Sequence, residues 1–368
     1  PSPNMSLESS PSIHRFIPPP ESSNRINIII PVILLIFMNQ QGLIDVTAET
    51  TIVQEEDYIR AITMNIEVNQ STDEYIVDTC TFTNCLSGAI DIRLSNGGKA
   101  SVINSQFTGC QTSGSGGAIN ANIQSGGILT IDGQCRFTKC TSQNSGGGIN
   151  LWIEGDDSKL IFGEGLIFDT CSSYDNGGGL YANIRTGSQL IFEGDCKFIN
   201  CSANSGSGGG MHSQSSGEGS LIRVISELLF ENCSSSFIGG GAFISAQDKA
   251  SIELNRVTCI DCKGSQGAGL SIQFGSNAVL TISGQSSFTR CESLDNGGGI
   301  YFDIQRENVE IRIIGPMNFT DCIGRYGGGM HINTIYQFII VMSSSYTFHN
   351  CTGYDGGGIY LSSSNIDS

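Results

Sequence analysis

The sequence predicts an all-β fold, a right-handed parallel β-helix (solenoid) of about ten coils with three short strands in each coil. Three observations lead to this prediction. A Phe-x-x-Cys element recurs at a nearly constant interval, a glycine cluster followed by an apolar residue recurs with it, and apolar residues alternate after each cluster. Glycine makes up 48 of the 368 residues, and runs of three glycines would break the helices of an α-helical repeat.

The Phe-x-x-Cys element sets the length of one coil. Its final cysteine recurs at intervals of 25 to 32 residues, and a near-fixed period of this length indicates a repeat architecture. The cysteines of this structural ladder are Cys85, Cys110, Cys140, Cys171, Cys201, Cys233, Cys262, Cys291, Cys322 and Cys351. Cys259 stands at the position that Phe takes in the other units. We expect Phe and Cys, three positions apart, to face the interior together because the strand bends between them.

Three strands are expected in each coil. Alternate apolar residues after the glycine cluster, as from Leu180 to Ile184, have the period of a strand. A second strand follows, as at residues 129–131, and a third leads into the Phe-x-x-Cys element, as at 135–137. The first strands should stack in parallel on one sheet, at about residues 119–123, 149–153, 180–184, 270–274 and 300–304.

The chain divides into three predicted regions. Residues 1–48 form a disordered N-terminus that holds a signal peptide. Residues 49–79 lack the repeat and are expected to cap the open end of the stack, which would otherwise expose edge strands. Residues 80–368 hold the β-helix repeats, as part of an array that is truncated at its C-terminal end.

The signal peptide is predicted from an apolar run at residues 26–38. Arg25 precedes this run, and the small residues Val46 and Ala48 follow it. A basic flank, a short apolar run and a small-residue cleavage site are the parts of a secretory signal. A membrane anchor that extends to Ile44 and a buried segment are the alternatives.

The glycine clusters and the Phe-x-x-Cys elements together resemble a known repeat. The run Gly116-Gly117-Ala118-Ile119 looks like the GGAI motif of the chlamydial polymorphic outer membrane protein repeat, and Phe-x-x-Cys is similar to the FxxN partner motif of that family. Such repeats also occur in surface proteins of protists. The resemblance covers about residues 80–361 and implies a β-helical surface protein involved in adhesion. Cys stands here where the family has Asn.

The cysteine ladder predicts a stack of buried thiols that fills one corner of the coils. Disulfides between neighbouring coils are the alternative, because stacked Cα atoms about 4.8 Å apart fall inside the ~4.4–6.8 Å that a disulfide allows. A secreted protein would also meet an oxidising compartment. Apart from Cys259 and Cys262, the sequence lacks the paired Cys-x-x-Cys clusters of a zinc site, so no metal and no cofactor are expected.

Acid–base chemistry on a sugar needs carboxylates that converge on one face. At the outward positions of the first strand only Asp91 and Asp303 are acidic, and they lie seven coils apart. His212 and His331 are four coils apart. No catalytic residue is therefore assigned. A carbohydrate-active enzyme, similar to a polysaccharide lyase or hydrolase, stays as the alternative function.

The same outward positions carry planar side chains that form a candidate face for a ligand or partner: Trp152, Tyr181, His212, Phe243, Tyr301, His331 and Tyr360. Aromatic residues that merely favour strands are the alternative explanation. Asn-x-Ser/Thr sequons make candidate glycosylation sites at Asn69, Asn200, Asn232, Asn318 and Asn350.

The expected function follows from fold and charge. A formal net charge of −17 repels nucleic acid and anionic lipid. We expect a secreted or surface-displayed structural and adhesive protein, located outside the cell or at its surface, that presents an extended face to a surface carbohydrate or protein. A membrane would be contacted only through the leader or a C-terminal anchor beyond the given sequence.

Overall fold

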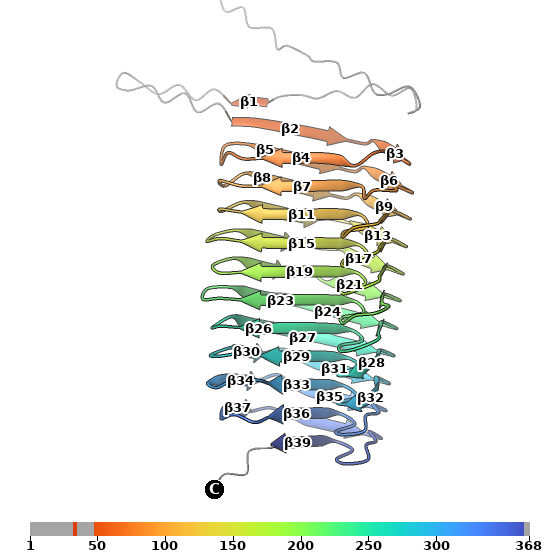
Figure 1. Ribbon diagram of the computed structural model, residues 1–368, viewed down its shortest axis with the longest axis vertical. Coiled ribbons are helices and arrows are strands. Elements are labelled where there is room, and N and C mark those ends of the chain that lie inside the picture. The colour runs from red at the N-terminus through yellow and green to blue at the C-terminus, as the bar shows by residue number, and fades with distance from the viewer. Residues whose placement is uncertain (1–31, 35–47, 364–368) are drawn as a thin grey trace, which may run out of the picture.

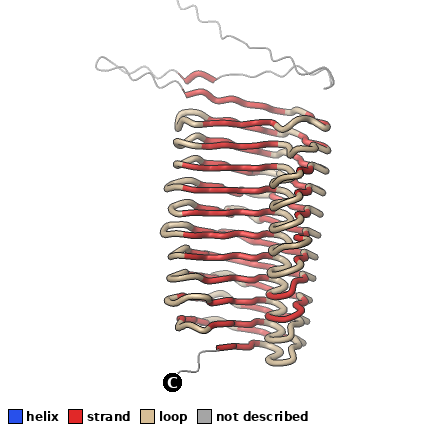
Figure 2. The backbone as a smooth tube through the Cα atoms, in the orientation of Figure 1, coloured by secondary structure: helices blue, strands red, loops and turns tan. Residues whose placement is uncertain are grey.

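Stacked coils of β-strand make up the protein (Figure 1). The computed structural model describes residues 32–34 and 48–363, and no helix occurs among them. The strands form three sheets that run along the stack, with the loops gathered at the edges between sheets (Figure 2). This arrangement confirms the predicted all-β parallel solenoid.

Sheet 1 contains one strand from each coil and holds the strands that follow the glycine clusters. Its eleven strands are β4 (Met64–Val68), β7 (Ile90–Leu94), β11 (Ile119–Gln124), β15 (Ile149–Glu154), β19 (Leu180–Arg185), β23 (Met211–Ser216), β26 (Ala242–Gln247), β29 (Leu270–Phe274), β33 (Ile300–Ile304), β36 (Met330–Thr334) and β39 (Ile359–Ser363). All neighbours in this sheet pair in parallel. The predicted parallel stacking of first strands is therefore confirmed.

Sheet 2 carries two strand tracks. The first track is β2 (Ala48–Gln54), β5 (Glu74–Asp78), β8 (Lys99–Ile103), β12 (Ile128–Asp132), β16 (Lys159–Phe162), β20 (Gln189–Phe192), β24 (Leu221–Glu231), β27 (Ser251–Ile260), β30 (Val279–Ile282), β34 (Val309–Ile313) and β37 (Phe338–Met342). The second track is β3 (Asp57–Ile59), β6 (Thr81–Thr83), β9 (Gln106–Thr108), β13 (Arg136–Thr138), β17 (Leu166–Asp169), β21 (Cys196–Ile199), β31 (Ser286–Thr289), β35 (Met317–Thr320) and β38 (Tyr346–His349). Strands β24 and β27 are long enough to serve both tracks.

Sheet 3 is a strand set that the sequence did not predict. Its strands are β10 (Gln111–Thr112), β14 (Thr141–Ser142), β18 (Ser172–Ser173), β22 (Ser202–Ala203), β25 (Ser234–Ser235), β28 (Lys263–Gln266) and β32 (Glu292–Asn296). They directly follow the ladder cysteines. Coils such as the one with β11, β12, β13 and β14 therefore hold four strands, where three were expected. Five of these strands have two residues each, which is too short to show a period of two.

The N-terminal region continues the solenoid. Strands β2, β3 and β4 pair in parallel with the strands of the next coil, so residues 48–68 form a coil that lacks the repeat motifs. Strand β1 (Val32–Leu34) pairs antiparallel with β2 and is the antiparallel exception among the described strands. The rest of the predicted signal run at 26–38 lies outside the described residues.

A stack of Phe rings lies at the centre of the core. Phe107, Phe137, Phe168, Phe198 and Phe230 are fully buried, and neighbouring ring centroids are 4.7–5.0 Å apart. The ladder cysteines beside them are also buried, except for Cys351, which is half-buried. Tyr58 extends the stack into the first coil, 4.8 Å from Phe82. The predicted interior Phe and Cys ladders are confirmed.

The bend expected between Phe and Cys is a single residue in the left-handed conformation. Every residue that precedes a ladder cysteine has a positive φ, including Thr170 at 57°, Asn200 at 54° and Arg290 at 50°. Asn and Gly adopt this conformation readily, whereas it is unfavourable for a β-branched residue. One left-handed residue reverses the alternation, so both Phe and Cys point inward.

The glycine cluster is required by close approach of the backbone. At Gly178, a Cβ atom would lie 2.3 Å from the carbonyl oxygen of Gly209 in the next coil and 2.4 Å from that of Ser202. Gly177 has a φ of +66°. The segment from the ladder cysteine to the sheet 1 strand varies in length: it spans 9 residues from 171 to 180, 10 from 201 to 211 and 8 from 262 to 270. The sheet 1 register stays one-to-one across these differences.

Candidate functional site

The outer surface of sheet 1 carries two columns of side chains, one residue per strand in each. In the first column, strand pairing places Tyr181 beside His212, His212 beside Phe243, and Tyr301 between Ser271 and His331. Tyr360 follows His331. Six of the seven predicted face residues therefore share one column. Trp152 belongs to the second column, where it pairs with Asn122 and Asn183.

Four of the six predicted residues in the first column point away from the core and are nevertheless buried. The relative exposure is 4% for His212, 6% for Phe243, 5% for Tyr301 and 4% for His331. The glycine loop that leads into each strand folds back over the column. For example, a Cβ at Gly208 would lie 2.8 Å from the Cα of His212. These four residues therefore face away from the core, as the alternation predicts, but they pack beneath the loop and are closed to a ligand.

Ring contacts hold this buried column together. Tyr181 stacks on His212 at 5.2 Å between centroids, and His212 lies 4.8 Å from Phe243. Further along, His331 lies 5.3 Å from Tyr301 and 5.1 Å from Tyr360. The column therefore stabilises the seam between sheet 1 and its covering loop. Tyr181 and Tyr360 remain half-buried.

Burial holds both histidines neutral. At His212 neither ring nitrogen meets a hydrogen-bond partner in the described part of the chain. Desolvation lowers the pKa of His212 to about 4, and the nearby backbone of Ser207 opposes this shift. Desolvation also lowers the pKa of His331 to about 4, against the attraction of Asp303. His331 Nε2 lies 2.8 Å from Ser362 Oγ, whereas its Nδ1 has no partner within the described residues.

Amide ladders replace the rings in the first coils. Asn120 Nδ2 donates to Asp91 Oδ1 at 2.6 Å, and Asn150 Nδ2 donates to Asn120 Oδ1 at 2.8 Å. Each amide therefore uses its neighbour in the stack as a partner. These side chains hold the surface in register and are already satisfied by one another.

The second column is accessible and mostly uncharged. From β11 to β29 its residues are Asn122, Trp152, Asn183, Gln214, Ser245 and Gln273. Ser245 is buried, Asn122 is exposed and the other four are half-buried. Asn183 and Gln214 make no side-chain hydrogen bond within the described residues, unlike Asn120 and Asn150. Their amide groups are therefore free to bind a ligand.

Trp152 is the aromatic member of this column. The Arg185 guanidinium lies over its ring, 4.4 Å from the centroid, and Trp152 Nε1 is 3.5 Å from Glu154 Oε2. Arg185 and Glu154 are exposed. This is a cation–π contact at a solvent-facing site. Trp152, the only tryptophan of the chain, lies beside the unpaired amide of Asn183 on the neighbouring strand.

A polar network ends the second column. Gln273 Nε2 and Asn333 Nδ2 both donate to Asp303, at 3.4 and 3.1 Å. Ser362 Oγ donates to Asn333 Oδ1 at 2.9 Å. Asp303 is therefore satisfied by amides, without a basic partner within the described ion pairs.

Ion pairs are rare on this surface. Of the nine ion pairs among the described residues, only the pair of Arg93 with Asp91 lies on sheet 1. Asp91 and Asp303 are separated by seven strand steps, or roughly 34 Å at the usual strand spacing. Paired carboxylates in glycosidases lie within about 10 Å. These two carboxylates cannot act together. Within the described residues, no cluster of three or more His, Cys, Asp or Glu side chains could hold a metal ion.

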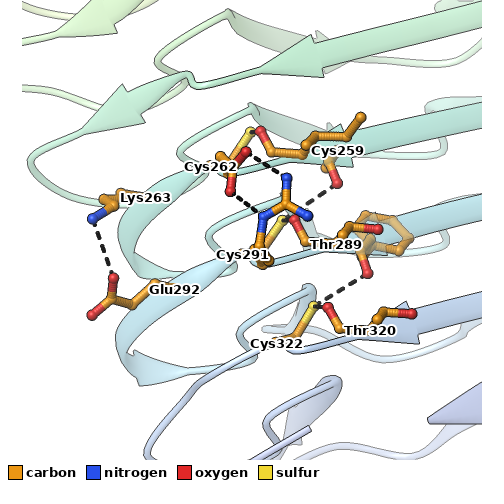
Figure 3. Close-up of polar contacts among 12 residues, drawn as sticks. Cys259, Cys262, Lys263, Thr289, Cys291, Glu292, Thr320 and Cys322 are labelled. Carbon is orange, nitrogen blue, oxygen red and sulfur yellow. Dashed lines mark hydrogen bonds and ion pairs between the residues drawn. The ribbon is translucent and has the colours of Figure 1, made fainter. Parts of the chain in front are cut away.

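The thiol column is a separate chemical feature. All fourteen cysteines fall within the described residues and are free thiols. From Cys110 to Cys322, each ladder thiol donates to the carbonyl at the Phe position of the preceding coil, at 3.3–3.6 Å. Figure 3 shows this arrangement from Cys259 to Cys322, with the Lys263–Glu292 ion pair at 3.2 Å on the outer side. Each thiol is thus a small apolar group with a satisfied donor.

The sequons lie mainly at exposed corners. Asn69, Asn200, Asn232 and Asn350 are exposed, and Asn318 is half-buried. Three of the amides already have partners within the stack. Asn232 Nδ2 donates to Asn200 Oδ1 at 2.7 Å, and Asn350 Nδ2 donates to Asp321 Oδ1 at the same distance.

In comparisons with known proteins, no protein-family model, curated protein or solved structure matches this chain. Among the described residues, none forms a helix of the length and apolar character that crossing a membrane requires.

Proposed function

We propose that the protein is a secreted or surface-displayed structural and adhesive β-helix that presents the outer face of sheet 1 to a partner. The observation that carries this proposal is the second column, an uncharged row that continues over six strands and contains unpaired amides at Asn183 and Gln214. A rigid row of this kind offers the same contact repeatedly along an extended partner, and repeated weak contacts add to a firm attachment.

The resemblance of the repeats to those of polymorphic outer membrane proteins supports the same function. It would also account for a right-handed coil and for a leader that directs secretion. A carbohydrate-active enzyme receives no support from Asp91 and Asp303, because seven strand steps of sheet 1 separate these two carboxylates.

Attachment of coated beads tests the proposal. Beads carrying the full chain should adhere to surfaces coated with extracellular glycans or proteins, and the combined variant Trp152→Ala, Asn183→Ala, Gln214→Ala should lose this adhesion. The matched control is Thr130→Ala with Gln189→Ala, two half-buried residues on the outer face of sheet 2. Equal adhesion by the two variants would contradict a binding role for sheet 1.

A further inference from the structure

The unpaired amides of the second column have the chemistry of carbohydrate recognition. A side-chain amide has two N–H donors and an oxygen with two lone pairs, so it can bind the paired hydroxyl groups of a sugar as donor and acceptor together. Asn183 and Gln214 present such groups on neighbouring strands, without a partner among the described residues. Trp152 adds an apolar ring on the preceding strand, and aromatic rings with a polar edge suit ligands that are apolar on one side and wet on the other.

The charge of the surface indicates whether the carbohydrate is neutral or anionic. The column is uncharged from β11 to β29, and the chain carries a net charge of −17. An anionic polysaccharide would be repelled by this field, and Arg185, which lies against Trp152, is the basic side chain next to the free amides. A neutral polysaccharide meets no such repulsion, and its hydroxyl groups can be desolvated against amides that hydrogen-bond to them.

The spacing of the coils indicates which glycosidic linkage the polysaccharide has. The core rings show that one coil advances 4.7–5.0 Å along the stack. An extended chain of β-(1→4)-linked pyranose rings advances by only slightly more than this length per ring. Successive rings of a short oligosaccharide can therefore face successive strands. An α-(1→4)-linked chain of the same sugar curves away and cannot keep this register.

We infer, on the basis of the function proposed above, that sheet 1 binds a neutral β-(1→4)-linked polysaccharide lying along the stack, with one sugar ring per coil over Trp152, Asn183 and Gln214. The indole of Trp152 contacts one sugar ring on the side that the Arg185 guanidinium leaves open, and the two amides bind the hydroxyl groups of the next two rings. The inference assigns a binding site and a ligand class to Trp152, Asn183 and Gln214, which lie outside the core.

Calorimetric titration of the full chain with matched tetrasaccharides tests this inference. Cellotetraose, tetra-N-acetylchitotetraose and mannotetraose are the neutral β-(1→4)-linked probes, and maltotetraose is the control with the same sugar as cellotetraose and the other linkage. At least one β-linked probe should bind, more tightly than its disaccharide, and maltotetraose should not. Gln214→Ala and Trp152→Ala should each weaken binding roughly tenfold, which corresponds to the loss of one good contact. Gln189→Ala on sheet 2 should leave binding unchanged, and thermal unfolding will show that all variants keep the fold.

Equal binding of cellotetraose and maltotetraose, binding that Gln214→Ala leaves unchanged, or no binding of any β-linked probe would overturn the inference. The bead assay separates this failure from that of the proposed function. If adhesion still depends on sheet 1 while no tetrasaccharide binds, the face serves a protein or an anionic partner and only the ligand class is wrong. If adhesion is also independent of sheet 1, both are wrong.

Discussion

Replacing Phe168 by alanine should lower the free energy of unfolding by about 4 kcal/mol. The Phe168 ring is fully buried, and its centroid lies 4.8 Å from that of Phe137 and 4.7 Å from that of Phe198. Burial of a Phe side chain contributes about 1.5–3 kcal/mol and each stacked pair about 0.5–1.5 kcal/mol. The sum agrees with the ~3–5 kcal/mol typical of Phe→Ala in a core. The coils on both sides are held by their own hydrogen bonds, so the cavity cannot close.

Phe348 provides the matched control. It occupies the same position of the repeat but is half-buried and stacks on one ring, that of Phe319, at 4.8 Å. Phe348→Ala should therefore cost about half as much. Urea unfolding followed by the fluorescence of Trp152 and by circular dichroism measures both, and comparison of the two signals detects unfolding of separate segments, which repeat proteins permit. Equal losses at positions 168 and 348 would refute the argument that the two-sided stack is what stabilises the core.

Three further experiments test the left-handed residue before the ladder cysteine, the buried His212 and the free thiols. Thr170→Gly should stabilise the fold by about 1 kcal/mol, because it removes a β-branched residue from positive φ. Asn84→Gly, at the same position of another coil, should change little, and a destabilised Thr170→Gly would contradict the strained corner. His212 has a pKa of about 4 in the fold against 6.5 when exposed, so stability should be complete above pH 6.5 and fall toward pH 4, by up to about 3 kcal/mol; His212→Phe should reduce this loss in pH-dependent melts, and an unchanged pH profile would show that His212 is not the group responsible. Thiol titration of the native protein should detect Cys351 first, because it is half-buried, whereas the denatured protein should yield all 14 thiols; recovery of four or fewer would show a largely oxidised ladder.

The sequence was a good guide wherever one coil repeats another. Phe and Cys recur at a fixed separation, so their shared burial and the bend between them could be predicted, and the left-handed residue at Asn200 or Thr170 is the physical form of that bend. The first strands could be placed because their apolar residues alternate. Tyr58 was missed as a member of the ring stack because its coil lacks both the glycine cluster and the cysteine.

The burial of the first column could not be read from the sequence. A period of two shows which side of a sheet a residue faces, whereas it says nothing of a loop that folds over that side. His212 and Phe243 alternate correctly and still lie beneath the glycine loop. The free amides of Asn183 and Gln214 could not be predicted either, because the sequence does not distinguish a hydrogen-bonded amide in a ladder from an unpaired one. The signal that was available is composition, since this column lacks charge over six coils.

The variable length of the segment between each ladder cysteine and sheet 1 has an evolutionary consequence. Spans of 8, 9 and 10 residues leave the register of sheet 1 unchanged, while β28 and β32 within the segment pair with a register shift, so insertions and deletions there are absorbed outside sheet 1. The same segment covers the aromatic column beside the proposed binding face. Lineages that diverge in this segment could therefore alter the rim of that face, and so its recognition by a host or a competitor, while the inherited scaffold beneath stays the same.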